Sequence, residues 1–411
     1  MALIVQKYGG TSVGSPERIV NIARRALAAR RAGHDVVVVV SAMSGETNRL
    51  LKLTDAVARS PGAREQDVVV STGEQVTVGL LALAIQGLKG RARSFLGHQV
   101  KILTDSTFAN ARIRSIDGER LLASLKKREI AVVAGFQGVD EEGNLTTLGR
   151  GGSDTTAVAL AAALKADACE IYTDVDGVYT TDPRICERAR KLARISYEEM
   201  LELASLGSKV LQIRSVEFAM KYKVPLWVKS SFSDDPGTLV CEEDEMMEDV
   251  LVSGIALTRD EARFVIRAVP DKPGVAAKIF GSLAEVGVVV DVIVQTPAHG
   301  DKRTDLAFTV GRLDVGRTAK LVKKIGKQIG AGEVEYEEGI AKVSIVGVGM
   351  RNHAGVAAKM FQVLADEGVN IRVISTSEIK ISCLIDEKYS ELAVRALHTA
   401  FGLDGPAAAK S

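Results

Sequence analysis

Five consecutive valines, residues 36–40, are the feature that most restricts the fold. A strand with an apolar side chain at every position has no face for water. Such a strand belongs in a parallel sheet that helices cover on both faces. Other short apolar runs along the first part of the chain have the same character, and we expect strands at residues 3–6, 68–70, 100–103, 130–134, 169–173 and 226–228.

Helix signals lie between these runs. Ser15, Pro16 and Glu17 supply a cap, a first-turn proline and an acidic residue in that order, and Gly33 ends the predicted helix. Thr72 followed by Gln75 fits a capping box. Strands that alternate with helices predict an α/β fold with a mainly parallel central sheet covered by helices.

The composition changes at residues 242–249, which are mostly acidic and have no apolar face, so we interpret them as a linker. A repeat follows the linker. The segment Gly274-Val275-Ala276-Ala277-Lys278 recurs as Gly355-Val356-Ala357-Ala358-Lys359. Two copies are too few for a solenoid. We therefore expect two small α+β modules that pack together.

Charge and cysteine usage exclude several classes of protein. The chain has 53 Lys+Arg and 52 Asp+Glu, and a formal net charge of +1 argues against a dedicated nucleic-acid binder. No apolar run approaches the roughly 18 residues that span a membrane. The N-terminus lacks the basic and apolar regions of a signal peptide. Cys169, Cys186, Cys241 and Cys383 lack metal-ligand spacing. We expect a cytoplasmic protein with free thiols, no metal site and no membrane contact.

The first chemical motif is Lys7-Tyr8-Gly9-Gly10-Thr11-Ser12, between a predicted strand and helix. Glycines let backbone N–H groups approach phosphate oxygens, and a helix N-terminus favours anions. The spacing of a P-loop and that of a dinucleotide-binding fingerprint are both absent. An ordinary strand-to-helix turn remains an alternative at this point.

A second glycine-rich turn, Gly149-Arg150-Gly151-Gly152-Ser153-Asp154, opens an alanine-rich helix. Arginine suits two-pronged capture of a carboxylate. Asp154 could instead only cap the helix. Two glycine-rich turns that suit anions are far more specific than one.

Polar clusters follow other predicted strands. They are Ser41 to Asn48, Ser71 to Glu74, and the loop from Thr173 to Arg184, which could also be a solvated turn. In open parallel sheets, ligands bind beyond the carboxyl ends of the strands. We therefore expect these clusters to meet at one crevice.

With these motifs assembled, the chain resembles the aspartate kinases of the amino-acid kinase family over nearly its whole length. The repeated modules look like ACT domains, a βαββαβ fold that binds amino acids. The resemblance implies a catalytic domain at residues 1–241, a linker at 242–249, a first ACT domain at 263–339, and a second built from 250–262 and 340–411.

The implied reaction is transfer of phosphate from ATP to the side-chain carboxylate of L-aspartate, the first step toward lysine, threonine and methionine. A carboxylate is ionised at neutral pH, so the nucleophile needs no general base. Lys7, held by Asp154, would neutralise phosphoryl charge, and Mg²⁺ would accompany ATP. The implied ATP contacts are Lys7, Gly9, Gly10, Thr11, Ser12, Thr173, Asp174, Tyr179, Asp182, Arg184 and Lys209. The implied aspartate contacts are Ser41, Thr47, Glu74, Arg150, Gly151, Gly152 and Ser153.

The ACT domains imply feedback by lysine, threonine or both. The matching effector positions are Asp271, Gly274, Val275, Ala276, Asp291 and Gln295 in the first copy, and Val356, Asn370, Ile371, Ser377 and Glu378 in the second. The first copy has Val289 and Val290 where the second has Asn370 and Ile371, which weakens the case for a ligand there. ACT domains usually pair between chains, so we expect an oligomer.

Two alternatives are a kinase of the same fold with another substrate and a non-catalytic amino-acid sensor. Glu74, Arg150 and the ACT domains argue against the first, and the presence of Lys7 and Asp154 argues against the second. Met246 and Met247 in the linker raise a further possibility, an internal start near Met247 that yields a short ACT-only chain. Ordinary linker methionines remain the alternative.

Overall fold

The computed structural model describes residues 2–207, 210–244, 250–296 and 302–404, and divides the chain into two compact units. The first unit comprises Met1–Tyr179 and Lys191–Asp249, and the second comprises Thr180–Arg190 and Val250–Ser411. The sequence places residues 180–190 within the catalytic domain, whereas the structure groups them with the C-terminal modules, because their contacts are to residues beyond 250.

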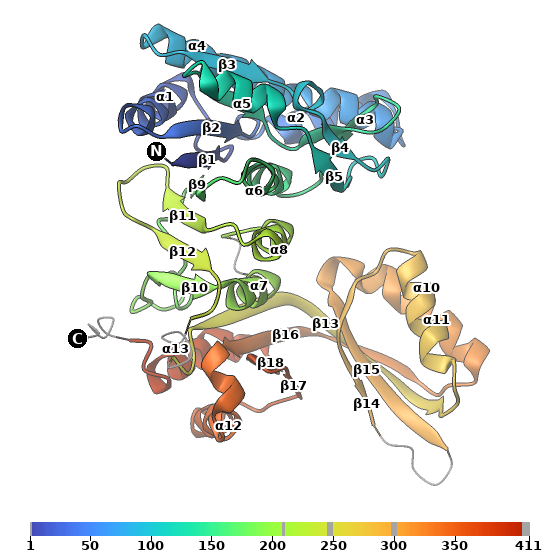
Figure 1. The fold of residues 1–411 in the computed structure, drawn as a ribbon. Coiled ribbons are helices and arrows are strands. Elements are labelled where there is room, and N and C mark those ends of the chain that lie inside the picture. Colours follow the sequence, from blue (N-terminus) through green and yellow to red (C-terminus); the bar gives the residue numbers. More distant parts are fainter. Residues whose placement is uncertain (1, 208–209, 245–249, 297–301, 405–411) are drawn as a thin grey trace. The chain divides into compact units, whose positions relative to one another are not determined.

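The first unit is built on an eight-stranded sheet in the order β10-β12-β11-β9-β1-β2-β6-β3 (Figure 1). Its strands are β1 (Leu3–Tyr8), β2 (Asp35–Val40), β3 (Ala92–Phe95), β6 (Ile130–Ala134), β9 (Ala168–Thr173), β10 (Arg194–Ser196), β11 (Leu226–Ser230) and β12 (Thr238–Cys241). All pairs are parallel except β11 with β12. The valines of β2 are fully buried. The parallel α/β prediction is confirmed.

Helices cover this sheet. They are α1 (Pro16–Arg31), α2 (Glu46–Val57), α3 (Ala63–Val70), α4 (Thr72–Gly87), α5 (Glu119–Lys126), α6 (Gly152–Leu164), α7 (Tyr197–Ser205) and α8 (Ile213–Tyr222). A smaller sheet contains β4 (Ile102–Thr104), β5 (Ile113–Ile116), β7 (Gln137–Val139) and β8 (Leu145–Thr147). Helix α1 begins as predicted, because the hydroxyl of Ser15 accepts from the Arg18 N–H at 3.4 Å.

Three local predictions are wrong. Residues 68–70 form the last turn of α3, because three apolar residues in a row fit a buried helix as well as a strand. Thr72 makes no capping box, since its hydroxyl donates to the Val69 carbonyl at 2.6 Å and α4 follows α3 almost directly. Residue 100 ends a 3-10 turn, η1 (Gly97–Val100), and the strand begins only at Ile102.

Helices α3 and α4 together, Ala63–Gly87, are long and apolar enough to cross a membrane by length and composition. Half of the apolar window is buried inside the unit. Asp67 is buried too, and it accepts hydrogen bonds from the N–H groups of Ala109 and Thr147. These are the properties of a core helix, so one such segment is weak support for a membrane span.

The second unit is one six-stranded sheet in the order β14-β15-β13-β16-β18-β17. Its strands are β13 (Gly254–Pro270), β14 (Val290–Gln295), β15 (Arg303–Gly311), β16 (Val334–Val346), β17 (Val373–Thr376) and β18 (Lys380–Asp386). Its helices are α10 (Val275–Glu285), α11 (Val315–Ile329), α12 (Val356–Asp366) and α13 (Ser390–Ala400). The central strands β13 and β16 are long enough to serve both repeats, and each repeat has its own apolar core.

Candidate active site

The predicted site residues of the first unit follow strands that end in register. Tyr8 at the end of β1 lies opposite Val40 of β2 and Tyr172 of β9, and Ser230 of β11 lies opposite Thr173. Because these strands are parallel, the loops that follow them leave from one edge of the sheet. Ligands of open α/β sheets bind at this edge.

Lys7 and Asp154 form an ion pair at this edge. The Lys7 Nζ lies 2.6 Å from Asp154 Oδ1, and each side chain is 11% exposed. Lys7 is the second-last residue of β1, and Asp154 lies in the first turn of α6, whose N-cap Gly151 makes no side-chain cap. Asp154 therefore does not serve as the helix cap. A buried ammonium held by one carboxylate can meet the negative charge of a phosphoryl group.

The absence of side chains at Gly9 and Gly10 prevents crowding around the Lys7 ammonium and the Ala42 carbonyl. A Cβ atom on Gly9 would lie 3.3 Å from the Lys7 Nζ, and one on Gly10 would lie 3.1 Å from the Ala42 carbonyl oxygen. The amide of Ser12 donates to the Gly9 carbonyl at 3.0 Å, and its hydroxyl lies 2.6 Å from that of Ser231. The Ser12 amide is thus already used inside the turn.

Glu74 connects the predicted cluster Ser71 to Glu74 with the cluster Ser41 to Asn48. It lies in the first turn of α4, is 3% exposed, and accepts a hydrogen bond at Oε1 from the Ala42 N–H at 2.9 Å. In the part of the chain that the structure describes, Oε2 has no hydrogen-bond partner. Burial raises the pKa of Glu74 to about 7, against the lowering effect of the Ala42 hydrogen bond. A buried carboxyl with an unused oxygen suits an ammonium ligand.

Ser41 directly precedes Ala42, whose N–H donates to Glu74, and Thr47 follows five residues after Ala42. Ser41 follows β2, is partly exposed, and donates its amide to the Tyr8 carbonyl at 3.1 Å. Thr47 lies in the first turn of α2 and is also partly exposed. Both predicted aspartate contacts therefore come from the loop and helix that follow β2.

Arg150 stands on a turn that needs glycine on both sides. Gly149 and Gly151 have φ angles of +73° and +68°, and a Cβ atom on Gly151 would overlap the Gln212 side chain. Arg150 is exposed, and no polar partner of its guanidinium occurs among the described residues. The buried start of α6 follows with Gly152 and Ser153, so Arg150 lies four residues before Asp154 in the chain.

The residues predicted to contact the nucleotide fall into two groups. Thr173, Asp174 and Tyr179 belong to the first unit, where the Tyr179 hydroxyl donates to Asp176 Oδ1 at 2.9 Å. Asp182 and Arg184 belong to the second unit and pair with each other at 2.8 Å. The predicted Lys209 lies outside the described residues.

Comparison with known proteins identifies the family. Residues 2–230 match the amino acid kinase family, and residues 264–327 and 343–401 match ACT domains. The chain is 61% identical over 409 residues to an aspartokinase of Pseudomonas aeruginosa, with 99% of each chain covered. It is 50% identical to an aspartokinase of Corynebacterium glutamicum, with 98% of this chain and 97% of that one covered.

The chain belongs to the aspartate kinases of the amino acid kinase family. The fold is similar to the crystal structure of E. coli aspartokinase III in complex with aspartate and ADP, with a TM-score of 0.80 and 28% identity over 97% of this chain and 99% of that one. A second crystal structure of the E. coli enzyme, in complex with lysine and aspartate, gives a TM-score of 0.78 at 28% identity.

The predicted effector positions of this aspartate kinase lie on corresponding parts of the two repeats. In each copy they lie at or just before the start of a helix, α10 or α12, and on or beside an edge strand, β14 or β17. Most are exposed. Asp291 pairs with the buried Lys342, and Glu378 lies 3.8 Å from Arg351. Val356 is buried in the core of the repeat.

Two residues that hold the predicted site loops in place are missing from the sequence-based predictions. Arg214 of α8 donates to the carbonyls of Leu148 at 2.6 Å and Ala111 at 2.9 Å, and so fixes the approach to the Arg150 turn. Ser231 holds Ser12. No local motif marks either residue, because each contacts partners far away in the sequence.

Proposed function

We propose that the chain transfers the γ-phosphoryl group of ATP to the side-chain carboxylate of L-aspartate. A carboxylate oxygen of aspartate forms the new bond to phosphorus, the bond from phosphorus to the β,γ-bridging oxygen breaks, and ADP leaves. The products are ADP and 4-phospho-L-aspartate. The observation that carries the proposal is the Lys7–Asp154 pair at the same sheet edge as a buried Glu74 with an unused oxygen.

Lys7 acts on the phosphoryl group in this proposal. An ammonium held in place by Asp154 stabilises the charge on the transferring group without having to reorganise during the reaction. The backbone of Gly9, Gly10 and Thr11 and the hydroxyl of Ser12 line the same turn. Thr173, Asp174, Tyr179, Asp182, Arg184 and Lys209 complete the nucleotide contacts by family resemblance.

Aspartate is held by groups of opposite charge. Glu74 binds the α-ammonium, because its free oxygen is buried and its carboxylate form gains from a cation. Arg150 binds the α-carboxylate with its planar guanidinium. Ser41, Thr47 and the Gly151–Ser153 backbone surround the substrate. The β-carboxylate is ionised without a general base.

Mg²⁺ enters with ATP as part of the substrate. Asp154 is engaged by Lys7, and Glu74 is buried with one oxygen held by the Ala42 N–H, so these two carboxylates do not form a cage for an ion. This donor set fits an ion that keeps phosphate oxygens and water as its ligands. Mg²⁺ would then neutralise charge on the ATP phosphates.

In this proposal the reaction is the first step in the synthesis of lysine, threonine and methionine. Lysine, threonine or both bind the ACT repeats as feedback effectors. The edge strands β14 and β17 carry exposed apolar side chains, among them Ile293 and Ile374. Such edges pair readily with a second chain, which supports an oligomer formed through the repeats. The cytoplasm, where ATP and aspartate meet, is the expected location.

A coupled assay tests the proposal. Purified protein is given MgATP with aspartate, glutamate or N-acetylglutamate, and both ADP release and hydroxylamine capture of the acyl phosphate are measured. We expect turnover with aspartate alone. The assay is repeated with lysine, threonine and their mixture. Preferred turnover of another acid would refute the substrate assignment, and unchanged rates with both amino acids would refute the feedback.

A further inference from the structure

The short segment Thr180–Arg190 interrupts the first unit and packs within the second. The two ends of the segment, its base, are hydrogen-bonded to each other. The Thr180 N–H donates to the Arg190 carbonyl at 2.8 Å, and the Arg190 N–H donates back to the Thr180 hydroxyl at 2.9 Å. The N–H of Ile255 in β13 donates to the Thr180 carbonyl at 2.7 Å. The base of the segment is thus bound to the sheet of the second unit.

His398 of α13 holds the same threonine and is fully buried. Its Nε2 lies 2.8 Å from the Thr180 hydroxyl, and its Nδ1 lies 2.5 Å from Asp404 Oδ1. A carboxylate accepts, so Nδ1 carries the proton and Nε2 accepts from the hydroxyl. The Thr399 hydroxyl, followed by His398 and Arg188, holds the pKa of Asp404 below its usual value. The imidazole is therefore fixed at both nitrogens.

Two further contacts fix the rest of the segment. Arg395, one turn before His398 on α13, donates to the Ile185 carbonyl at 3.4 Å, and Arg190 Nε donates to the Leu403 carbonyl at 2.7 Å. Asp182 and Arg184 lie between these anchors in a tight turn, in which the Ile185 N–H donates to the Asp182 carbonyl at 2.9 Å. The position of both residues thus depends on α13 and the chain just after it.

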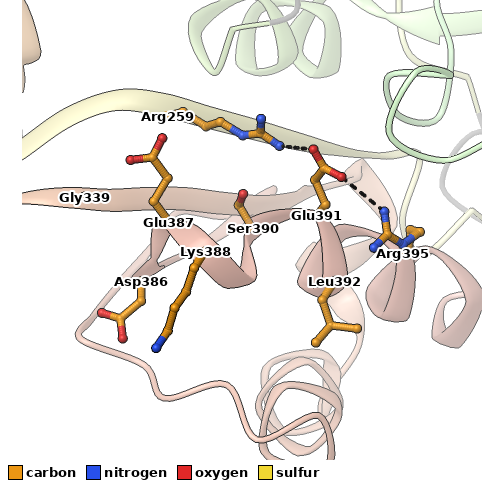
Figure 2. A pocket seen from close by; sticks show the side chains of 9 residues that line it. All are labelled: Arg259, Gly339, Asp386, Glu387, Lys388, Ser390, Glu391, Leu392 and Arg395. Carbon is orange, nitrogen blue, oxygen red and sulfur yellow. Dashed lines mark hydrogen bonds and ion pairs between the residues drawn. The ribbon is translucent and has the colours of Figure 1, made fainter.

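Helix α13 is also held near its N-terminus. Figure 2 shows Glu391 between Arg259 of β13 and Arg395, and it pairs with them at 2.8 Å and 3.4 Å. These three residues line a cavity of about 760 Å³. The ion pair with Arg259 links α13 to β13 and adds to the contacts that hold the helix.

A metal ion is the competing explanation for this cluster. Ligand atoms of Cys186, His398 and Asp404 lie within 4.8 Å of one another, with Cys186 Sγ 3.6 Å from His398 Nδ1. However, the 2.5 Å between Nδ1 and Oδ1 is a hydrogen-bond distance. The Arg188 guanidinium also lies 3.3 Å from Asp404 and would repel a cation. The geometry favours the hydrogen-bonded arrangement.

We propose that His398 is a positioning residue for ATP. By holding Thr180, it sets the position of Asp182 and Arg184, and so supports nucleotide binding in the kinase reaction. This inference rests on the proposed function, in which Asp182 and Arg184 contact the nucleotide.

The test compares KM values for MgATP and for aspartate. His398→Leu and Thr180→Val each remove the bond between the two side chains, and we expect each to raise KM for MgATP about fivefold or more, with KM for aspartate and kcat within about twofold. His398→Gln keeps an amide that can accept from the hydroxyl, so it should recover part of the loss. Thr181→Val is the matched control, because Thr181 is also buried in the segment and makes no bond to His398.

A merely structural defect gives a different result. Partial unfolding lowers the active fraction, so kcat would fall while both KM values stayed unchanged. Arg184→Ala reports separately on the proposed function and should raise KM for MgATP. If Arg184→Ala raises this KM while His398→Leu and Thr180→Val do not, the positioning role is wrong and the kinase assignment stands. If Arg184→Ala has no effect, the proposed nucleotide contact is wrong. Stoichiometric zinc in the purified protein, lost in His398→Leu, would overturn the hydrogen-bond account.

Discussion

The pKa of Glu74 predicts how aspartate binding depends on pH. Its carboxyl is buried, and burial raises the pKa from an ordinary value of 4.5 to about 7. An ammonium ligand favours the carboxylate form, since it replaces the solvation that burial has removed. The protonated form lacks this attraction. KM for aspartate should therefore be high on the acid side of pH 7 and fall as the pH rises.

The magnitude follows from the titration. If only the carboxylate binds, the apparent KM is multiplied by one plus the ratio of the proton concentration to the acid dissociation constant of Glu74. For a pKa of about 7, this factor falls from about 11 at pH 6 to about 1.1 at pH 8. KM for aspartate should thus fall about tenfold. For a pKa of 4.5, the factor would stay near 1 throughout.

The assay measures KM for aspartate at saturating MgATP between pH 6 and pH 8. ATP also titrates near this range, so Glu74→Gln serves as the control, with the same shape and no titratable group. Its KM should be raised at pH 8 and change little with pH. A wild-type KM that is flat between pH 6 and pH 8, or a pH dependence that Glu74→Gln retains, would refute the reasoning.

Further predictions concern the other motifs. Lys7→Ala should lower kcat by about a hundredfold or more, since it removes the cation that meets the phosphoryl charge, and near-normal turnover in a folded variant would contradict this role. Arg150→Lys keeps the charge but loses the planar fork, so KM for aspartate should rise far more than KM for ATP, and an equal rise in both would exclude a dedicated carboxylate contact. Asn370→Ala should weaken feedback at unchanged basal activity, which inhibition curves for lysine and threonine measure. Replacing Met246 and Met247, which lie outside the described residues, by leucine should abolish a short second product of the native gene; a single full-length product in the native host would refute the internal start.

The sequence predicts the central sheet well but misreads one helix. Residues 36–40 form a buried parallel strand as predicted, because five β-branched residues in a row leave no polar face for a surface element. Residues 68–70 look the same over a shorter length but end a helix. Only the structure shows the difference, because a run of three apolar residues has no distinguishing period.

The candidate site is predictable where chemistry and glycine spacing coincide. Lys7 and Asp154 each lie beside a glycine-rich turn in the sequence, and in the structure they form an ion pair. Arg214, Ser231 and His398 are not marked, because their roles depend on contacts across more than sixty residues of chain. Such contacts arise from the tertiary fold, and local sequence patterns carry no sign of them.

The long strands β13 and β16 have a consequence for the growing chain. On the ribosome, the start of β13 emerges well before its partners: Gly254 pairs with Val346, which in turn pairs with Lys380 of β18. The first repeat can complete its strand pairs early. The second repeat can do so only after β18, near the end of the chain, has been made. A chain cut short before β18 would leave the edge of β16 unpaired, and exposed strand edges promote aggregation. We therefore expect premature stop codons there to yield aggregated or degraded protein rather than an active kinase that has merely lost its control by end products.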